Sequence, residues 1–143
     1  MNFQTMSNTQ GKQFDQMCRM LLDDAGWIVG DRPVVVREAG VEIDCEALHP
    51  DFGRVWFEFK GSWRGPRPGM MRTDTVKKAI VSGYLLRSAL IDVPYVVMTS
   101  HLPPVGSQGE VMMGRALGDG VVAGVVCINS PTWLRDLILA VGR

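Results

Sequence analysis

The sequence predicts an α/β fold in which a mixed central β-sheet is covered by helices on both faces. Residues 41–60 alternate between apolar and polar side chains, as strands with one buried face do. Pro94 to Ser100 and Val121 to Ile128 are short, nearly continuous apolar runs, as in strands that are buried on both faces. Segments with helical spacing of apolar residues separate these strands, so we expect a helix, sheet and helix layering.

Composition is consistent with one domain, residues 1–143, of which 1–8 are expected to be frayed. Fifteen basic and fifteen acidic residues give no net charge, but from Lys60 to Lys78 six basic residues accompany a single acid. The three cysteines fit neither zinc nor disulfide spacing and are expected to be reduced thiols. With no secretion signal and no long apolar run, we expect a cytoplasmic protein without a membrane partner.

The first predicted helix carries an apolar stripe and ends at Gly26. The stripe consists of Phe14, Met17, Cys18, Leu21, Leu22 and Ala25. Asn8 or Thr9 is expected to cap the helix. Asp15 lies at the edge of the stripe, and two interpretations stay open. Its carboxylate can reach over the core toward the next strands, or it can sit in the first turn because the helix dipole favours an acid there.

An extended segment at 34–36 is followed by two strands, Val41 to Leu48 and Arg54 to Lys60, joined by a turn. A turn centred near Asp51 places Asp44 directly opposite Glu58, with Lys60 on the same face. The opposite face is apolar: Val41, Ile43, Cys45 and Ala47 on one strand and Val55, Phe57 and Phe59 on the other. A slip of one residue would turn both sets to the wrong side, so the pattern specifies the register.

Two carboxylates directly across a ladder repel each other, so the pair needs a positive charge nearby. A hard divalent ion such as Mg²⁺ or Mn²⁺ suits oxygen ligands backed by a lysine. In the predicted register Glu42 falls opposite Lys60. It therefore either pairs with this lysine or adds a further acid to the site.

These residues resemble the signature of the PD-(D/E)xK nuclease superfamily, which has the restriction-endonuclease-like fold. The matching residues are Ile43-Asp44, thirteen intervening residues, and Glu58-Phe59-Lys60, with Ile43 where the family motif has proline. The predicted order of elements from Gly11 to Ile128 is also similar to that core. The resemblance implies Mg²⁺, with Mn²⁺ as a substitute, held by Asp44, Glu58 and the carbonyl of Phe59, and a catalytic role for Lys60.

The same resemblance implies supporting residues on two helices. An acid on the first helix often supports the metal, and Asp15 is at the matching position. A polar residue on the helix after the second strand completes the site, and Lys77 and Lys78 are both candidates. The helix dipole disfavours a cation near a helix N-terminus, which indicates that one of these lysines binds an external anion.

Gly61 to Gly69 is rich in Gly, Pro and Arg and is predicted to be a loop beside the site. Arg64, Arg67 and Arg72, with the two lysines, are candidate phosphate ligands, and Trp63 is expected to anchor the loop. A helix capped by Thr73 or Asp74 should reach Leu90. Its buried side is expected to hold Val76, Ala79, Ile80, Gly83, Leu86 and Leu90. Further helices are predicted from Ser107 to near Gly118 and from Pro131 to Val141.

The predicted function is a Mg²⁺-dependent DNA endonuclease, of restriction type or junction-resolving. A homodimer is expected if both strands of a duplex are cut. The alternative is a catalytically silent module of the same fold that binds nucleic acid or protein. A metabolic α/β enzyme is disfavoured because no Gly-rich cofactor loop is present. His49 and His101 match no triad or zinc spacing and are expected to be structural or exposed.

Overall fold

The computed structural model describes residues 3–63 and 65–142, and it confirms the α/β class with a mixed sheet. Five strands form the sheet in the order β1-β4-β5-β6-β7, and β2 and β3 form a separate ribbon. The strands are β1 (Ile28–Val29), β2 (Val34–Val36), β3 (Val41–Ile43), β4 (Cys45–His49), β5 (Gly53–Lys60), β6 (Tyr95–Thr99) and β7 (Gly124–Cys127). The helices are α1 (Phe3–Asp24), α2 (Thr73–Ser88), α3 (Gln108–Gly118) and α4 (Trp133–Val141), with a 3-10 turn at Gly69–Met71.

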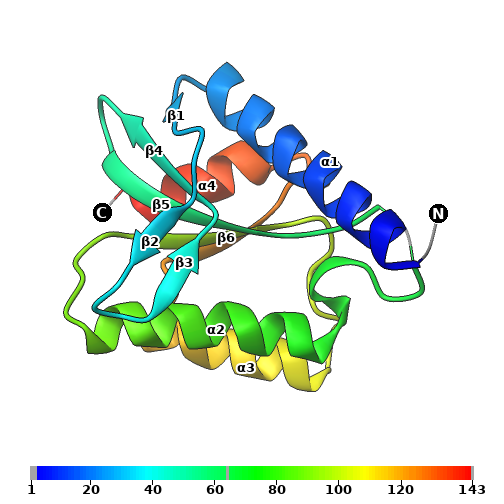
Figure 1. Cartoon of the computed structure of the whole chain (residues 1–143). Helices are drawn as coiled ribbons and strands as arrows, with labels where there is room; N and C mark the ends of the chain where they lie inside the picture. The colour runs from blue at the N-terminus through cyan, green and yellow to red at the C-terminus, as the bar shows by residue number, and fades with distance from the viewer. Residues whose placement is uncertain (1–2, 64, 143) are drawn as a thin grey trace.

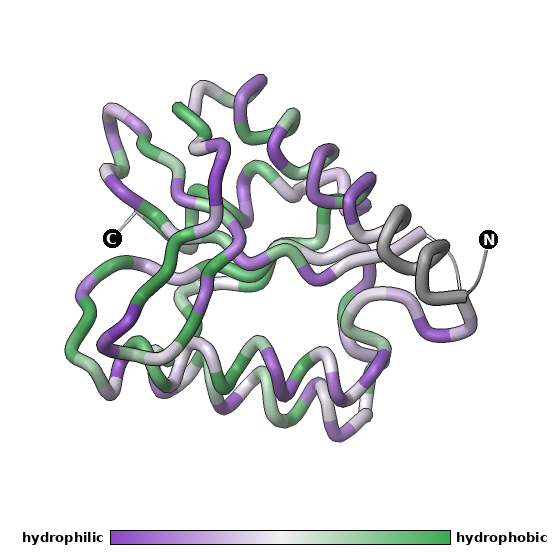
Figure 2. Tube along the Cα trace, viewed as in Figure 1, coloured by the Kyte–Doolittle hydropathy of each residue, from purple (hydrophilic) through white to green (hydrophobic). Residues whose placement is uncertain are grey.

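Helices cover both faces of the sheet, as Figure 1 shows: α1 and α4 lie on one side and α2 and α3 on the other. Hydrophilic and hydrophobic residues alternate along the coloured parts of the helices (Figure 2), which is the pattern of helices with one apolar side. The core beneath α1 and α4 includes Phe14, Cys18, Leu22, Phe57 and Leu137. The core beneath α2 and α3 includes Trp56, Val76, Ala79, Val97 and Met113. The sheet is therefore buried on both faces.

The β4–β5 hairpin has the predicted register. Cys45 lies opposite Phe57 and Ala47 opposite Val55, while His49 pairs with Gly53 across the turn. Beyond β5 the chain crosses over through α2, so β6 pairs with β5 in parallel, and β7 continues parallel to β6. The alternation of apolar and polar residues was sufficient to specify the hairpin because its apolar set fits only one face.

The single strand predicted from Val41 to Leu48 is wrong, because the chain bends at Asp44. Before the bend, β3 leaves the main sheet and pairs with β2, with Val34 opposite Ile43. Ile43 therefore packs in the core beneath α2 and α3, not behind the carboxylates with Cys45. The predicted position of Glu42 opposite Lys60 is wrong for the same reason, since Glu42 lies opposite Val35 on the β2–β3 ribbon. Of the two alternatives for Glu42, this disfavours pairing with Lys60 and leaves its role as a further acid of the site.

Three helix ends, in α1 and α2, differ from the predictions. Helix α1 already runs from Phe3, so Asn8 and Thr9 lie within it and not at its N-terminus. The expected frayed segment is helical from residue 3, and residues 1–2 lie outside the described residues. Arg72, not Thr73 or Asp74, is the N-cap residue of α2. Leu90 follows the end of α2 with φ +60° and is 90% exposed, so it is not part of the buried side.

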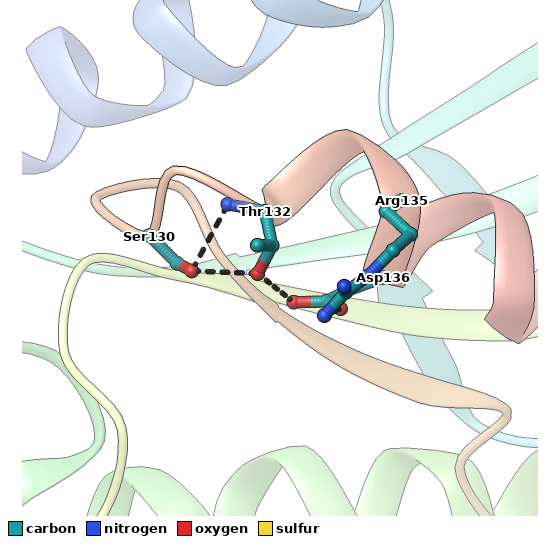
Figure 3. Close-up of polar contacts among 4 residues, drawn as sticks. All are labelled: Ser130, Thr132, Arg135 and Asp136. Atoms are coloured by element: carbon teal, nitrogen blue, oxygen red, sulfur yellow. Dashed lines mark hydrogen bonds and ion pairs between the residues drawn. The ribbon is translucent and has the colours of Figure 1, made fainter.

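The start of α3 agrees with its predicted position, since the Ser107 hydroxyl accepts a hydrogen bond from the Glu110 N–H at 3.1 Å. Helix α4 begins at Trp133, two residues after Pro131, and hydroxyl groups make a series of hydrogen bonds at its start (Figure 3). There the Thr132 N–H donates to Ser130 Oγ at 3.3 Å, and the Thr132 hydroxyl donates to Asp136 Oδ2 at 3.1 Å. These contacts fix the first turn of the helix.

All three cysteines are free thiols, and Cys18 and Cys45 are buried, as predicted. Within residues 3–63 and 65–142, no helix has the length and apolar character needed to cross a membrane.

Candidate functional site

The bend at Asp44 brings its side chain against the second strand of the hairpin. The Phe59 N–H donates a 2.8 Å hydrogen bond to Asp44 Oδ2, and the Asp44 N–H donates at 3.3 Å to Glu58 Oε1. The register of β4 and β5, continued by one residue, places Asp44 opposite Glu58. The two carboxylates that the sequence singles out are therefore adjacent, although Asp44 lies at a bend and not in a regular strand.

Glu58 is the most deeply buried acid of the site, with 4% of its surface exposed. Burial, and then the hydrogen bond and negative charge of Asp44, raise the pKa of Glu58 from its ordinary 4.5 to about 8, against the opposing effect of Lys60. The Tyr95 hydroxyl lies 3.4 Å from Glu58 Oε2 and donates to the Ala79 carbonyl at 2.9 Å. A buried acid whose pKa is raised by burial and by a neighbouring acid is a candidate functional group.

Tyr95 was not identified from the sequence. It is the first residue of a strand that is otherwise apolar, Tyr95–Thr99, and it directly follows Pro94. A hydroxyl within a fully buried strand has to find a hydrogen-bond partner inside the protein. That requirement could have singled out Tyr95 in the sequence, but it does not identify the hydrogen-bond partner of the hydroxyl.

Arg19 was also missed, and it connects α1 to the bend. Its guanidinium donates to the carbonyl of Gly30 and, at 2.8 Å, to the carbonyl of Asp44. It lies 3.4 Å from the Cys45 sulfur and 5.5 Å from the centre of the Phe59 ring. An arginine at this place holds the backbone of Asp44 where no strand ladder does.

Asp15 lies in the middle of α1, so the interpretation based on the dipole of the first turn is wrong. Burial and then the charge of Asp44 raise the pKa of Asp15 from 3.8 to about 6, while Arg19 and Lys60 act in the opposite direction. Its carboxylate is therefore within electrostatic reach of the hairpin. The interpretation that Asp15 extends over the core toward the site agrees with this position.

An open pocket of about 530 Å³ lies over the two acids, between β3 and α2. Asp44, Glu58 and Lys60 line it from the hairpin. Both Lys77 and Lys78 line it from α2, so the pocket does not discriminate between these two candidates. The remaining lining residues are Gly40, Val41, Glu42, Val81, Ser82 and Leu85. Glu42 therefore lies at the site as part of the pocket lining, although it is not paired opposite Lys60 on a neighbouring strand.

The loop after β5 is tied to the end of β6. The Trp63 ring meets Phe14 edge-on with 5.6 Å between centroids, which confirms that Trp63 anchors the loop. The Ser62 N–H donates to Ser100 Oγ at 3.0 Å, and the Thr99 hydroxyl donates to the Lys60 carbonyl at 2.7 Å. The backbone on both sides of Gly61 is fixed by these contacts, which limits the positions open to Lys60.

The predicted phosphate-binding arginines are less closely associated with the pocket. Arg67 and Arg72 are exposed and do not line it. Arg64 lies outside the described residues. The histidines have structural contacts, as expected: His49 packs on Trp27 and Phe52, and the His101 Nδ1 lies 2.9 Å from Ser100 Oγ.

The donor atoms at the bend fit a small hard cation. No group of three or more Asp, Glu, His or Cys side chains within the described ranges is arranged to hold a metal. Mg²⁺, however, commonly takes only one or two carboxylates and completes its shell with water and phosphate oxygens. Asp44 and Glu58, with the backbone carbonyl of Phe59, supply that kind of oxygen-only set.

Comparison of the chain with protein-family models, with curated proteins and with solved structures gives no match.

Proposed function

We propose that this protein is a Mg²⁺-dependent DNA endonuclease whose site consists of Asp44, Glu58 and Lys60. The proposal depends most on one observation: Asp44 and Glu58 are adjacent, and both line one pocket with Lys60. Adjacent acids can hold a divalent ion, and a nearby lysine can offset developing negative charge, so the arrangement suits metal-assisted phosphodiester hydrolysis.

The topology supports a restriction-endonuclease-like core as part of the proposal. A first helix leads into three antiparallel strands, β1, β4 and β5, and α2 then connects to the parallel strands β6 and β7. Asp44 and Glu58 lie at neighbouring positions of the central hairpin. This order and these positions are what the motif resemblance leads one to expect.

Each protein group has a definite part in the proposed reaction. Asp44 and Glu58, with the Phe59 carbonyl, would hold the ion, and a bound Mg²⁺ would polarise the scissile phosphate and lower the pKa of the attacking water. Lys60 orients this water and offsets the negative charge that develops in the transition state. From α2, Lys77 and Lys78 bind non-bridging oxygens of the scissile phosphate or of flanking phosphates. Asp15 adds negative charge near Asp44 that would favour the bound ion.

The proposed partner is DNA, and the number of copies depends on the substrate. One chain offers one such site, so cutting both strands of a duplex or a branched junction takes two chains. A homodimer is therefore part of the proposal for these substrates.

A cleavage assay with supercoiled plasmid and branched DNA, with and without Mg²⁺, tests the function. Asp44→Asn and Lys60→Ala should each abolish Mg²⁺-dependent cleavage. Asp92→Asn and Lys12→Ala, which change exposed residues that do not line the pocket, should leave it unchanged. Cleavage that survives both site substitutions would exclude the proposed site.

A silent binding module of the same fold is the second candidate, and the hydrogen bonds of the acids favour it. Asp44 and Glu58 already accept bonds from the Phe59 and Asp44 N–H groups. A module that only binds could retain both acids for this structural purpose. DNA binding without cleavage under any metal condition would support this candidate.

A further inference from the structure

Helix α2 carries an aromatic and an aliphatic side chain on its exposed side, next to the lysines of the pocket. Tyr84 is 59% exposed and Val81 54% exposed. The buried side of the helix is made by Val76, Ala79, Gly83 and Leu86, so neither exposed residue serves the core. Val81 follows Lys77 and Lys78 by four and three residues, and Tyr84 follows Val81 by three. Residues at these spacings are neighbours on a helix surface.

The pocket lining combines apolar and charged side chains. Val41 from β3 and Val81 and Leu85 from α2 form apolar parts of its lining, and Ser82 adds a hydroxyl. The carboxylates of Asp44 and Glu58 belong to the same pocket. A volume of about 530 Å³ lies within the range of sites that hold small organic molecules. A nucleotide has the matching chemistry, since its flat base can pack on the apolar residues and its anionic phosphate can pair with Lys60, Lys77 and Lys78, which also line the pocket.

We propose that the site takes DNA at an unpaired nucleotide, whose base lies against Val81, Leu85 and Tyr84. Lys77 and Lys78 contact the backbone of this nucleotide, and its phosphate would approach the two acids only through the cation that they would hold. The inference rests on the proposed function and names its substrate class. It selects branched, frayed or single-stranded DNA over continuous duplex.

The burial of Glu58 and the apolar residues beside it together favour an unpaired nucleotide. Glu58 lines the pocket and is only 4% exposed, so the reacting phosphate has to enter the pocket to approach it. In continuous duplex the bases are paired and stacked, so a base can lie against Val81, Leu85 and Tyr84 only after it is extruded at an energetic cost. An unpaired nucleotide has no such cost, and its free face can stack on an exposed aromatic ring.

Fluorescence anisotropy in EDTA tests the inference without relying on catalysis. A labelled oligonucleotide of about 20 nucleotides, longer than the strand that one small domain contacts, is titrated as single strand and as blunt duplex. The wild-type protein should bind the single strand roughly tenfold more tightly than the duplex. Tyr84→Ala should weaken single-strand binding by roughly tenfold, because stacking of one base is lost.

Two further variants separate stacking from general damage. Tyr84→Phe keeps the ring and should bind within about twofold of wild type. Val111→Ala removes an equally exposed apolar side chain from α3, away from the pocket, and should have no effect. Binding by Tyr84→Phe as weak as that of Tyr84→Ala would assign the loss to the hydroxyl and overturn the stacking role.

Failure of this inference and failure of the proposed function give different results. Equal affinity for both forms, preference for duplex, or no binding to either would overturn the inference. Single-strand preference that depends on Tyr84, together with no cleavage in Mg²⁺, would retain the binding site and reject the endonuclease. Cleavage of continuous duplex that is insensitive to Tyr84→Ala would retain the endonuclease and reject the unpaired nucleotide.

Discussion

Asp44 Oδ2 accepts a 2.8 Å hydrogen bond from the N–H of Phe59, the residue that follows Glu58 on β5. This bond crosses from the bend to the neighbouring strand and sets the direction of the Asp44 carboxylate. The amide of Asp44 in turn donates to Glu58. The two carboxyl groups are therefore held together by backbone groups, without a regular ladder between them.

The stability of the metal-free protein should fall as the pH rises. Glu58 has a pKa of about 8 in the folded protein, against an ordinary 4.5, and Asp15 one of about 6 against 3.8. At a pH between the unfolded and the folded pKa of either acid, the folded protein retains a proton that the unfolded chain has released. Each increase in pH within that range therefore favours unfolding. In EDTA, the melting temperature should be lower at about pH 8.5 than at about pH 5.5.

Glu58→Gln and added Mg²⁺ both provide controls for this dependence. Glu58→Gln removes the main titrating group and should flatten the dependence. Mg²⁺ binds the deprotonated acids and should stabilise the protein most at high pH. Parallel pH profiles for wild type and Glu58→Gln would contradict the assignment of this effect to Glu58.

Arg19→Met should lower the free energy of unfolding by about 1–3 kcal/mol. Methionine retains an apolar stem, but the carbonyls of Gly30 and Asp44 lose the guanidinium donor. Arg135→Met is the matched control, because this side chain is 70% exposed and makes only a 3.6 Å ion pair with Asp136. The control should change stability by less than about 0.5 kcal/mol. Urea denaturation measures both, and equal losses would show that Arg19 does not fix the bend.

Much of this arrangement follows from local sequence patterns. The hairpin register, the order of helices and strands and the cap at Ser107 depend on alternation, turn residues and capping, which are properties of short segments. The pairing of Asp44 with Glu58 could be predicted because it is a consequence of that register.

The remaining features depend on contacts between distant segments. The bend at Asp44 requires β2 as an alternative partner for β3. Residues 41–48 alone do not determine whether 41–43 pair with β2 or with the end of β5. Arg19 and Tyr95 reach the site only because α1 and β6 pack against the hairpin. The start of α1 was missed because polar residues such as Asn8 and Thr9 are compatible with both a cap and a helix interior.

Gly69→Ala should be much more costly than a comparable substitution in open space. Gly69 has φ +60°, and a Cβ there would lie 2.8 Å from Ser100 Oγ and 3.0 Å from the His101 nitrogen. Gly40 has a similar φ of +70° but no atom within 4 Å of such a Cβ. We expect a loss of about 1 kcal/mol for Gly40→Ala from backbone strain, and a further loss of about 1–3 kcal/mol for Gly69→Ala from overpacking. Equal losses of stability for the two variants in thermal denaturation would show that Ser100 and His101 can move to accommodate a Cβ at residue 69.

Leu90→Gly should stabilise the protein. Leu90 adopts φ +60°, which costs an L-residue roughly 1–2 kcal/mol, and at 90% exposure it loses little burial on truncation. The greater entropy of glycine in the unfolded chain offsets part of this, leaving a gain of up to about 1 kcal/mol. Leu102→Gly, at an exposed residue outside the left-handed region, should be neutral or destabilising. A loss of stability in Leu90→Gly would indicate that the side chain is held by another contact.

The most direct test of the central claim is the location of a divalent ion. Crystals grown with Mn²⁺ above about pH 8, where Glu58 is largely ionised, allow the ion to be located by anomalous scattering. The predicted result is an anomalous peak within about 2.5 Å of carboxylate oxygens of both Asp44 and Glu58, which disappears in Asp44→Asn. No peak between these two acids at a Mn²⁺ concentration that saturates the protein, or a peak that persists in Asp44→Asn, would contradict it.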